Sequence, residues 1–311
     1  MAIGTVIRLD TASCLVMCEG RALKCPLPGK WRLQRRGQTR PIAVGDRVEV
    51  TPTGPDEGRL GEILPRQGGK LARKAAGDRD LEQVVAANVD QLVVVVAAAE
   101  PPLNRRMLDR LVVSGEHGGL DVVVCINKVD LVEPGSVEPI LDLYRRLGYR
   151  ALATSATTGT GIEQLRSILK DKTSVFAGPS GAGKSSLLMA VQPGLKLRVR
   201  PVSRATGKGR HTTTAVSLLP LEFGGYVVDT PGIREFALYD IERDELKHYF
   251  PEMEELFGQC RFNDCDHLHE PDCAVRAAVE AGRIDPERYE SYCRIYESLP
   301  EPGAARRRRE R

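Results

Sequence analysis

The sequence predicts a multidomain chain: a small β-barrel over residues 1–70, a central α/β domain over 71–240, and a mainly helical, metal-binding domain over 241–311. Three observations support this division. Short runs of alternating hydrophobicity, separated by turn residues, fill the first domain. Continuous apolar runs then alternate with helical stretches, which is typical of a parallel sheet. Towards the C-terminal end, three cysteines and a histidine lie within one short segment, residues 260–273.

The composition is that of a globular protein. At 311 residues, with 41% hydrophobic and 28% charged residues, the chain is long enough for two or three domains. No apolar run reaches the length of about 18 residues that a membrane span needs, and the first residues lack the features of a signal peptide. We therefore expect a cytoplasmic protein without a membrane partner, whose eight cysteines are thiols or metal ligands rather than disulfides.

Five short strands are expected in the first domain, near residues 5–8, 14–17, 22–25, 46–50 and 62–64. They predict a small closed barrel, of which the oligonucleotide-binding fold is the best-known kind. The domain has twelve Lys or Arg against seven Asp or Glu, although the whole chain has a net charge of only +3. A basic loop beside Trp31 contains Arg32, Arg35, Arg36 and Arg40. Such a loop suits contact with RNA, and a plain solvated loop is the alternative.

The central domain, 71–240, starts with a polar stretch, 71–90, that we expect to be a linker leading into its sheet. Apolar runs at 92–97 and 122–126 are typical of strands buried on both faces of a parallel sheet, and 151–154 continues the series. Helical stretches lie between and after these strands, near 105–115, 139–147 and 162–169. This alternation predicts a doubly wound sheet with ligand sites at the carboxyl ends of its strands.

One loop has the sequence G-x-x-x-x-G-K-S between an apolar strand, 173–177, and the start of a helix. In this phosphate-loop pattern the glycines let successive N–H groups point at phosphate oxygens, and the helix N-terminus favours negative charge. We expect Lys184 to reach the β- and γ-phosphates and Ser185 to bind Mg²⁺. The residues expected at the nucleotide are Gly178, Pro179, Ser180, Gly181, Ala182, Gly183, Lys184, Ser185 and Ser186.

Two further strand ends indicate which base is bound. The strand at 122–126 is followed by the string N-K-x-D, formed by Asn127, Lys128, Val129 and Asp130. The Asp130 carboxylate can accept hydrogen bonds from N1–H and the 2-amino group of guanine, a donor pair that adenine lacks. The next strand is followed by Ser155 and Ala156, whose backbone can meet the guanine O6. Together with the phosphate loop, these residues predict a site for GTP or GDP.

Two loop segments are expected beside the phosphates. Residues 196–210 contain six basic and no acidic side chains, and the next four residues are His211, Thr212, Thr213 and Thr214. A threonine here can complete the coordination of Mg²⁺. After a strand expected at 221–228 comes the sequence D-x-x-G. Its Asp229 is expected near Mg²⁺, and the N–H of its Gly232 at the γ-phosphate.

The order of these motifs is unusual. In ordinary GTPases the phosphate loop comes first and the base-recognition motif near the end, whereas here residues 127–130 precede 178–185. A sheet does not require one chain order, so circular permutation is physically allowed. As a consequence, the D-x-x-G segment leads directly into the C-terminal domain.

That domain contains the spacing C-x₄-C-x-H-x₅-C, formed by Cys260, Cys265, His267 and Cys273. Three thiolates and one imidazole fit a closed structural site for Zn²⁺, which would hold together a segment too small for its own core. Free thiols or a redox cluster are the alternatives, and His269 is a competing ligand. A helix is expected at 286–298, followed by a basic tail, 306–311, that either contacts RNA phosphates or only aids solubility.

Taken together, the barrel, the permuted motifs and the cysteine spacing resemble one family, the circularly permuted GTPases that depend on the small ribosomal subunit (RsgA or YjeQ). The resemblance covers nearly the whole chain. It implies a factor in late maturation of the small ribosomal subunit, with GTP hydrolysis stimulated by that subunit. It also implies that the first domain is an oligonucleotide-binding fold that docks on ribosomal RNA.

The residue after D-x-x-G is Ile233, at the position where many GTPases have a Gln that orients the attacking water. His211 is the best substitute, because a neutral imidazole can orient or deprotonate water. The resemblance implies the same catalytic role, and a loop contact to RNA is the alternative. The residues themselves do not decide which of Thr212, Thr213 and Thr214 binds Mg²⁺, whereas the resemblance implies Thr213.

We therefore expect a monomeric GTP hydrolase that binds the small ribosomal subunit and its rRNA in the GTP state and leaves after hydrolysis. Two other functions stay open. In one, the protein is an RNA-binding checkpoint or scaffold in which GTP is structural. In the other, it is a small-molecule kinase, against which the base-recognition motif argues.

Overall fold

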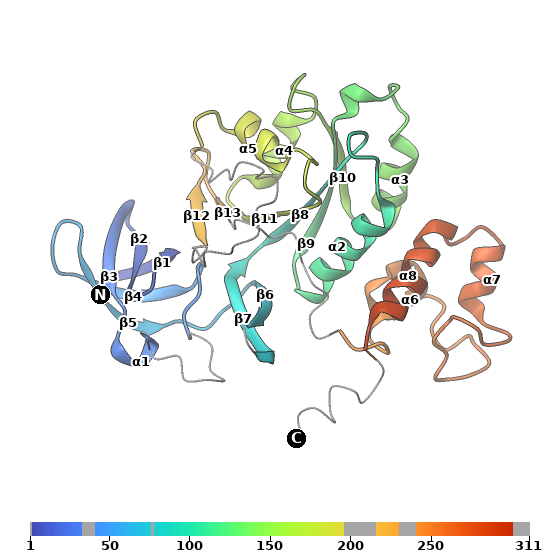
Figure 1. Cartoon of the computed structure of the whole chain (residues 1–311), viewed down its shortest axis with the longest axis horizontal. Coiled ribbons are helices and arrows are strands. Elements are labelled where there is room, and N and C mark those ends of the chain that lie inside the picture. The colour runs from blue at the N-terminus through green and yellow to red at the C-terminus, as the bar shows by residue number, and fades with distance from the viewer. Residues whose placement is uncertain (1, 33–40, 76–77, 196–215, 230–240, 301–311) are drawn as a thin grey trace, which may run out of the picture.

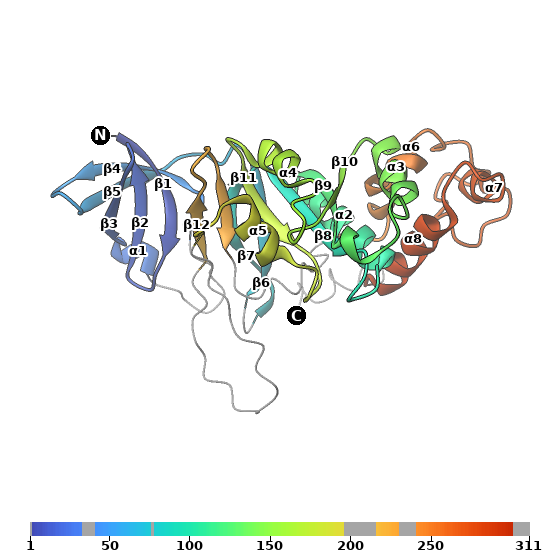
Figure 2. The same ribbon diagram turned by 90° about the horizontal axis from the view of Figure 1, so that it is seen from above.

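A computed structural model describes residues 2–32, 41–75, 78–195, 216–229 and 241–300. A β-barrel, an α/β domain and a group of C-terminal helices follow one another along the molecule in chain order (Figures 1 and 2). Within the described ranges, no helix is both long enough and apolar enough to cross a bilayer.

The first domain is a five-stranded barrel of β1 (Ala2–Leu9), β2 (Ser13–Cys18), β3 (Arg21–Pro26), β4 (Arg47–Pro52) and β5 (Gly58–Ile63). Strand β1 pairs antiparallel with both β2 and β4, while β3 pairs with β2 and β5 with β4. A bridge between Lys24 and Glu57 closes the barrel between β3 and the residues before β5. All five predicted strands are present, and β5 begins at Gly58 rather than at 62.

Trp31 belongs to the barrel core. It lies on the short helix α1 (Gly29–Arg32), is only 8% exposed, and shares a hydrophobic cluster with Val16 and Leu60. This burial leaves little of the ring for the RNA contact that we expected of the loop beside Trp31, because a large apolar ring is stabilised more by burial in the core. The rest of the predicted basic loop, including Arg35, Arg36 and Arg40, lies outside the described residues.

The stretch that we expected to be a linker forms a β-hairpin. Strands β6 (Gly69–Ala75) and β7 (Asp78–Val89) pair antiparallel as a separate two-stranded sheet. An antiparallel ribbon with one polar face needs few apolar residues, so its composition can resemble that of a linker. The second strand also contacts the barrel through a bridge between Val44 and Ala86.

The central sheet has the strand order β10-β9-β8-β11-β13-β12. Neighbouring strands are parallel except for the antiparallel pair β12 and β13. The predicted doubly wound sheet is therefore confirmed. Its strands are β8 (Gln91–Ala97), β9 (Asp121–Asn127), β10 (Arg150–Thr154), β11 (Thr173–Ala177), β12 (Ser217–Pro220) and β13 (Tyr226–Asp229).

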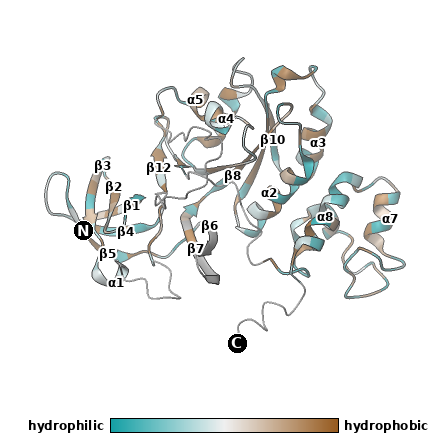
Figure 3. Ribbon diagram, in the orientation of Figure 1, coloured by the Kyte–Doolittle hydropathy of each residue, from teal (hydrophilic) through white to brown (hydrophobic). Residues whose placement is uncertain are grey.

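Helices cover both faces of this sheet (Figure 1). One face packs against α2 (Arg105–His117) and α3 (Glu138–Arg146), the other against α4 (Ile162–Leu169) and α5 (Lys184–Val191). Alternate residues of β8 serve the two faces, since Val94 joins the first core and Val93 and Val95 join the second. Figure 3 shows the matching two-sided character of α3, with hydrophobic and hydrophilic bands.

The strand expected at 221–228 is shorter than predicted. Gly224 and Gly225 have φ angles of +93° and +87°. The N–H of Leu221 donates to the carbonyl of Gly225 at 3.0 Å, which makes 221–225 the turn between β12 and β13. Two consecutive residues with positive φ are typical of a hairpin turn and cannot continue a strand.

The C-terminal domain is mainly helical. Its elements are η2 (Leu246–Tyr249), α6 (Pro251–Glu254), α7 (Ala274–Glu280) and α8 (Pro286–Ser298), and α8 has the bounds that the sequence predicts. The core contains aromatic pairs such as Phe250 and Tyr292, whose ring centroids are 5.2 Å apart. Val113 of α2 belongs to the same core, so this domain packs directly on the α/β domain.

Candidate functional site

The predicted nucleotide motifs follow the carboxyl ends of neighbouring strands in the central sheet. Strand β9 ends at Asn127, β10 at Thr154, β11 at Ala177 and β13 at Asp229. These strands all run parallel through β8. Carboxyl ends of parallel strands meet at one edge of a sheet, so the segments that follow them lie together despite the permuted chain order.

Asn127 joins the base motif to the phosphate loop. Its Nδ2 donates to the carbonyl of Ala182 at 2.8 Å, and its Oδ1 accepts a hydrogen bond from Thr154 Oγ1 at 3.2 Å. Asn127 is 1% exposed, so water does not compete for either bond. The approach requires a glycine at position 183, where a Cβ would lie 2.3 Å from Asn127 Nδ2. The role of the Thr154 hydroxyl was not predicted, because a threonine at a strand end has no distinctive pattern.

The curvature of the phosphate loop depends on glycine. A Cβ at Gly178 would lie 1.9 Å from the carbonyl oxygen of Val95, and Gly181 and Gly183 have φ angles of +84° and +89°. Lys184 is the first residue of α5, and its Nζ donates to the carbonyls of Gly178 at 2.7 Å and of Pro179 at 2.8 Å. The loop therefore combines a helix N-terminus with a cation held directly above the loop backbone, an arrangement that suits an oxyanion.

Lys128 and Asp130 lie at a short 3₁₀ turn, η1 (Val129–Leu131), directly after β9. Lys128 precedes the turn with φ +62°, and its Nζ donates to the carbonyl of Glu100 in the loop that follows β8. The side chain of Asp130 is exposed. This carboxylate is therefore accessible to a base that lies over the sheet edge.

Ser155 is buried in a tight turn after β10. Its N–H donates to the carbonyl of Thr160 at 3.0 Å, and its Oγ accepts from the N–H of Thr158 at 3.1 Å. Ala156 follows and is half-buried. Since Thr154 bonds to Asn127, these contacts hold the backbone of the turn beside the base motif.

Asp229 ends the strand next to the one that leads into the phosphate loop. Val228 lies opposite Val175 of β11, and Ser217 of β12 lies opposite Asp229. The first residue of D-x-x-G and the phosphate loop therefore leave adjacent strands. Other residues predicted for this part of the site lie outside the described residues: His211, Thr212, Thr213, Thr214 and Gly232.

The second predicted site is a compact cluster in the C-terminal domain. One ligand atom from each of Cys260, Cys265, His267 and Cys273 lies within 4.8 Å of the others. His267 Nδ1 is 3.5 Å from the Sγ atoms of both Cys260 and Cys273, which are 3.9 Å from each other. A tetrahedral ion with bonds of about 2.3 Å to sulfur and about 2.0 Å to nitrogen separates its ligands by about 3.8 Å (S···S) and about 3.5 Å (S···N). The cluster therefore has the dimensions to hold one metal ion.

The surroundings of the cluster favour metal binding over reactive thiols. Burial raises the pKa of Cys265 to about 12, which opposes a free thiolate, and burial lowers the pKa of His267, which keeps its imidazole neutral. The N–H of Ala274 donates to Cys260 Sγ at 3.4 Å and helps to orient this sulfur. His269 is exposed and does not belong to the cluster. As predicted, all eight cysteines are outside disulfides.

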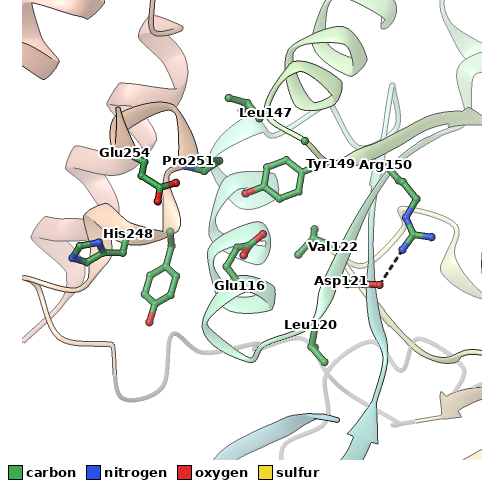
Figure 4. Close-up of a pocket in the computed structure, with 12 residues that line it drawn as sticks. Glu116, Leu120, Asp121, Val122, Leu147, Tyr149, Arg150, His248, Pro251 and Glu254 are labelled. Carbon is green, nitrogen blue, oxygen red and sulfur yellow. Dashed lines mark hydrogen bonds and ion pairs between the residues drawn. The ribbon is translucent and has the colours of Figure 1, made fainter. Parts of the chain in front are cut away.

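A cavity of about 460 Å³ lies away from both sites, between the α/β and C-terminal domains (Figure 4). Its lining includes Asp121 and Arg150, which begin β9 and β10, whereas the nucleotide motifs follow the ends of those strands. In Figure 4, His248 and Glu254 line the opposite side. None of the described nucleotide residues lines this cavity.

Comparisons with known proteins agree with the geometry. A family model described as RsgA GTPase matches residues 63–239. The small ribosomal subunit biogenesis GTPase RsgA of Caldanaerobacter subterraneus subsp. tengcongensis is 43% identical, over 96% of this chain and 96% of that protein. The protein of the same name from Moorella thermoacetica is 44% identical, over 93% of this chain and 94% of that protein.

Solved structures show the same fold. The crystal structure of YjeQ from Thermotoga maritima has a TM-score of 0.78 and 40% identity, and the match covers 96% of this chain and 98% of that chain. YloQ, described as a circularly permuted GTPase, has a TM-score of 0.72 and 32% identity, with 97% of each chain covered. Identity at this level over nearly the full length leaves one assignment. This chain belongs to the RsgA GTPase family and is a GTP hydrolase.

Proposed function

We propose that this protein binds the small ribosomal subunit in its GTP state, acts late in the maturation of that subunit, and leaves after hydrolysing GTP. The names of its relatives support the ribosomal part of the proposal. The observation that carries the nucleotide part is the bond from Asn127 Nδ2 to the Ala182 carbonyl, because it unites a base motif and a phosphate loop in one site. In this proposal the protein works as a monomer in the cytoplasm.

The guanine base lies at the carboxyl ends of β9 and β10. Asp130 accepts hydrogen bonds from N1–H and the 2-amino group, and the stem of Lys128 packs along the ring. Backbone groups of Ser155 and Ala156 meet O6. The N–H groups of residues 178–186 surround the phosphates. Lys184 exchanges its two carbonyl partners for β- and γ-phosphate oxygens, which attract its ammonium more strongly because they are charged.

The hydroxyl and carboxylate oxygens of Ser185, Thr213 and Asp229 suit Mg²⁺, which supplies charge stabilisation at the phosphates when bound. The N–H of Gly232 contacts the γ-phosphate. His211 orients or deprotonates the attacking water, since Ile233 cannot hydrogen-bond to it. This division of roles predicts that hydrolysis is slow until the subunit positions the segment around His211.

The flanking domains supply the RNA contacts. The pairing of the barrel strands, with β1 between β2 and β4 and closure between β3 and the residues before β5, supports an oligonucleotide-binding fold, and the surplus of basic residues suits ribosomal RNA. In the C-terminal domain, the set of three sulfurs and one imidazole nitrogen favours Zn²⁺ in a structural role. The basic tail, 306–311, adds contacts to RNA phosphates.

The test is GTP turnover with and without purified small subunits over a range of salt concentrations. We expect stimulation that falls as salt rises, because phosphate contacts release counterions. His211→Ala should bind GTP normally and lose most of the stimulated turnover, whereas Lys184→Ala should lose nucleotide binding. Normal association with and release from the subunit by Lys184→Ala would instead favour a scaffold in which GTP is structural.

A further inference from the structure

The loop that follows β8 contacts both halves of the nucleotide site, although it contains none of the predicted motif residues. The N–H of Ala98 donates to the carbonyl of Asn127 at 2.7 Å. Two residues later, the carbonyl of Glu100 accepts a hydrogen bond from Lys128 Nζ. Pro101 faces the phosphate loop, since a Cβ at Gly181 would lie 3.4 Å from Pro101 Cδ. Residues 98–101 therefore touch the base motif and the phosphate loop together.

We propose that residues 98–101 are a further part of the guanine site and that Glu100 is a positioning residue for Lys128. The inference rests on the proposed function, in which the stem of Lys128 packs along the base. A lysine stem has several rotatable bonds and loses their freedom when it lies against a ring. The bond from Lys128 Nζ to the Glu100 carbonyl orders the stem before the nucleotide arrives, so less free energy is lost on binding.

The backbone of Glu100, and not its side chain, performs this task. Glu100 has φ +52°, a conformation that residues other than Gly, Asn and Asp rarely adopt. Its side chain is exposed and makes no hydrogen bond or ion pair with the described residues. Substitutions at this position therefore act through the backbone that carries the carbonyl and remove no side-chain contact with the described residues.

Because the contact is made by the backbone of Glu100 and not by its side chain, variants that differ in their tolerance of positive φ can test it. Glu100→Val disfavours positive φ, because its side chain is β-branched, and turns the carbonyl away from Lys128. We expect its affinity for GTP and GDP to fall about 2-fold to 10-fold, the range for ordering one long side chain on binding. Glu100→Asn and Glu100→Gly accept positive φ and should restore most of the affinity. Wild-type affinity in Glu100→Val, or an equal loss in all three variants, would overturn the proposal.

A second measurement shows whether the effect passes through Lys128. Lys128→Met keeps an apolar stem and removes the ammonium, so adding Glu100→Val to it should cause no further loss of affinity. An additive loss would contradict the proposed role. If Glu100→Val does not fold, the comparison is between Lys128→Arg, which keeps a donor for the Glu100 carbonyl, and Lys128→Met. The arginine variant should lose less affinity, and equal losses would overturn the proposal.

The base itself distinguishes this proposal from the proposed function. Packing of the Lys128 stem on the base does not depend on the 2-amino group, which inosine triphosphate lacks. Glu100→Val should therefore lower the affinities for GTP and inosine triphosphate by the same factor. If the wild-type protein binds GTP no better than ATP, the proposed guanine site is wrong. If the wild-type protein prefers GTP to ATP, but Glu100→Val lowers the affinity for GTP and not for inosine triphosphate, the proposed guanine site is correct and the positioning role of Glu100 is wrong.

Discussion

The two flanking domains are joined to the nucleotide-binding domain by different kinds of contact. The C-terminal domain is held by buried side chains. Arg288 of α8 lies 2.6 Å from Asp109 of α2 and 2.7 Å from Glu252 of α6, with its own side chain fully buried. Tyr144 of α3 donates its hydroxyl to the same Asp109 oxygen. Burial alone would lower the pKa of Arg288, but Asp109 and Glu252 raise it well above its usual value, so the Arg288 guanidinium stays charged.

The barrel is held by backbone contacts together with apolar packing of Ile7 and Val44 against the core of the α/β domain. Arg8 of β1 pairs with Ser217 of β12, and the N–H of Ala87 in β7 donates to the carbonyl of Val44 at 2.8 Å. Gly45 approaches β7 so closely that a Cβ would lie 2.0 Å from the carbonyl oxygen of Ala87. The side chain of Asn88 adds a hydrogen bond of 3.0 Å to the carbonyl of Gly45.

The two junctions therefore differ in how they respond to change. Backbone bonds survive most substitutions, whereas a buried ion network fails when one member is lost. They also reach different parts of the nucleotide site. The barrel contacts β12, next to the strand that ends at Asp229. The C-terminal domain contacts α2, which follows the loop whose Glu100 carbonyl accepts a hydrogen bond from Lys128.

Removal of the proposed zinc ion should destabilise the C-terminal domain more than any other change. The apparent binding free energy of structural zinc sites is about 10–16 kcal/mol, and it acts as folding free energy. Treatment with a chelator, or Cys265→Ser, should make the segment around the cluster sensitive to protease. GTP affinity should stay near that of the untreated protein, because the nucleotide motifs lie on another domain. Full protease resistance in metal-free protein would contradict a structural role for the ion.

Arg288→Met should have the next largest effect. It leaves Asp109 and Glu252 as buried carboxylates without their cation, which should lower the free energy of unfolding by about 3–5 kcal/mol. Arg106→Met is the matched control, because its partner Glu290 lies on the same helix as Arg288 and the two side chains are 56% and 47% exposed. The control should cost less than about 1 kcal/mol. Urea unfolding, with hydrogen exchange of the α8 amides as the probe, measures the free energy of unfolding of both variants. Similar losses in Arg288→Met and Arg106→Met would show that the buried network is no more important than an exposed ion pair.

Asn88→Ala tests the side-chain part of the barrel junction. It removes the bond to Gly45 and the bond of 2.9 Å that Asn88 Oδ1 accepts from the N–H of Gln67. We expect the free energy of unfolding of the barrel to fall by about 1–3 kcal/mol. Asn88→Gly separates these bonds from the effect of the positive φ of +52°, which alanine tolerates poorly. Trp31 is the only tryptophan and lies in the barrel core, so its fluorescence during urea unfolding reports on this domain. If Asn88→Ala lowered the free energy of unfolding more than Arg288→Met does, the barrel junction would be the more sensitive of the two, which would contradict the account.

The nucleotide site could be predicted from the sequence because its signals are local. Glycines mark the phosphate loop, and the base motif directly follows an apolar strand. Contacts between segments that are distant in the chain have no such local sequence pattern. Arg288 lies on a helix with many polar residues, where most arginines face water, and its burial depends on α2 and α6. The contact between Lys128 and Glu100 could not be predicted from the sequence either, because a backbone carbonyl makes it and every residue has one.

Binding of GTP and xanthosine triphosphate to Asp130→Asn tests the central claim most directly, that separated motifs form one guanine site. Asparagine cannot accept from both N1–H and the 2-amino group, so GTP affinity should fall about 10-fold to 100-fold. The side-chain amide that this substitution introduces can donate to O2 of xanthine, so affinity for xanthosine triphosphate should rise. Unchanged affinity for GTP, with no gain for xanthosine triphosphate, would contradict the account.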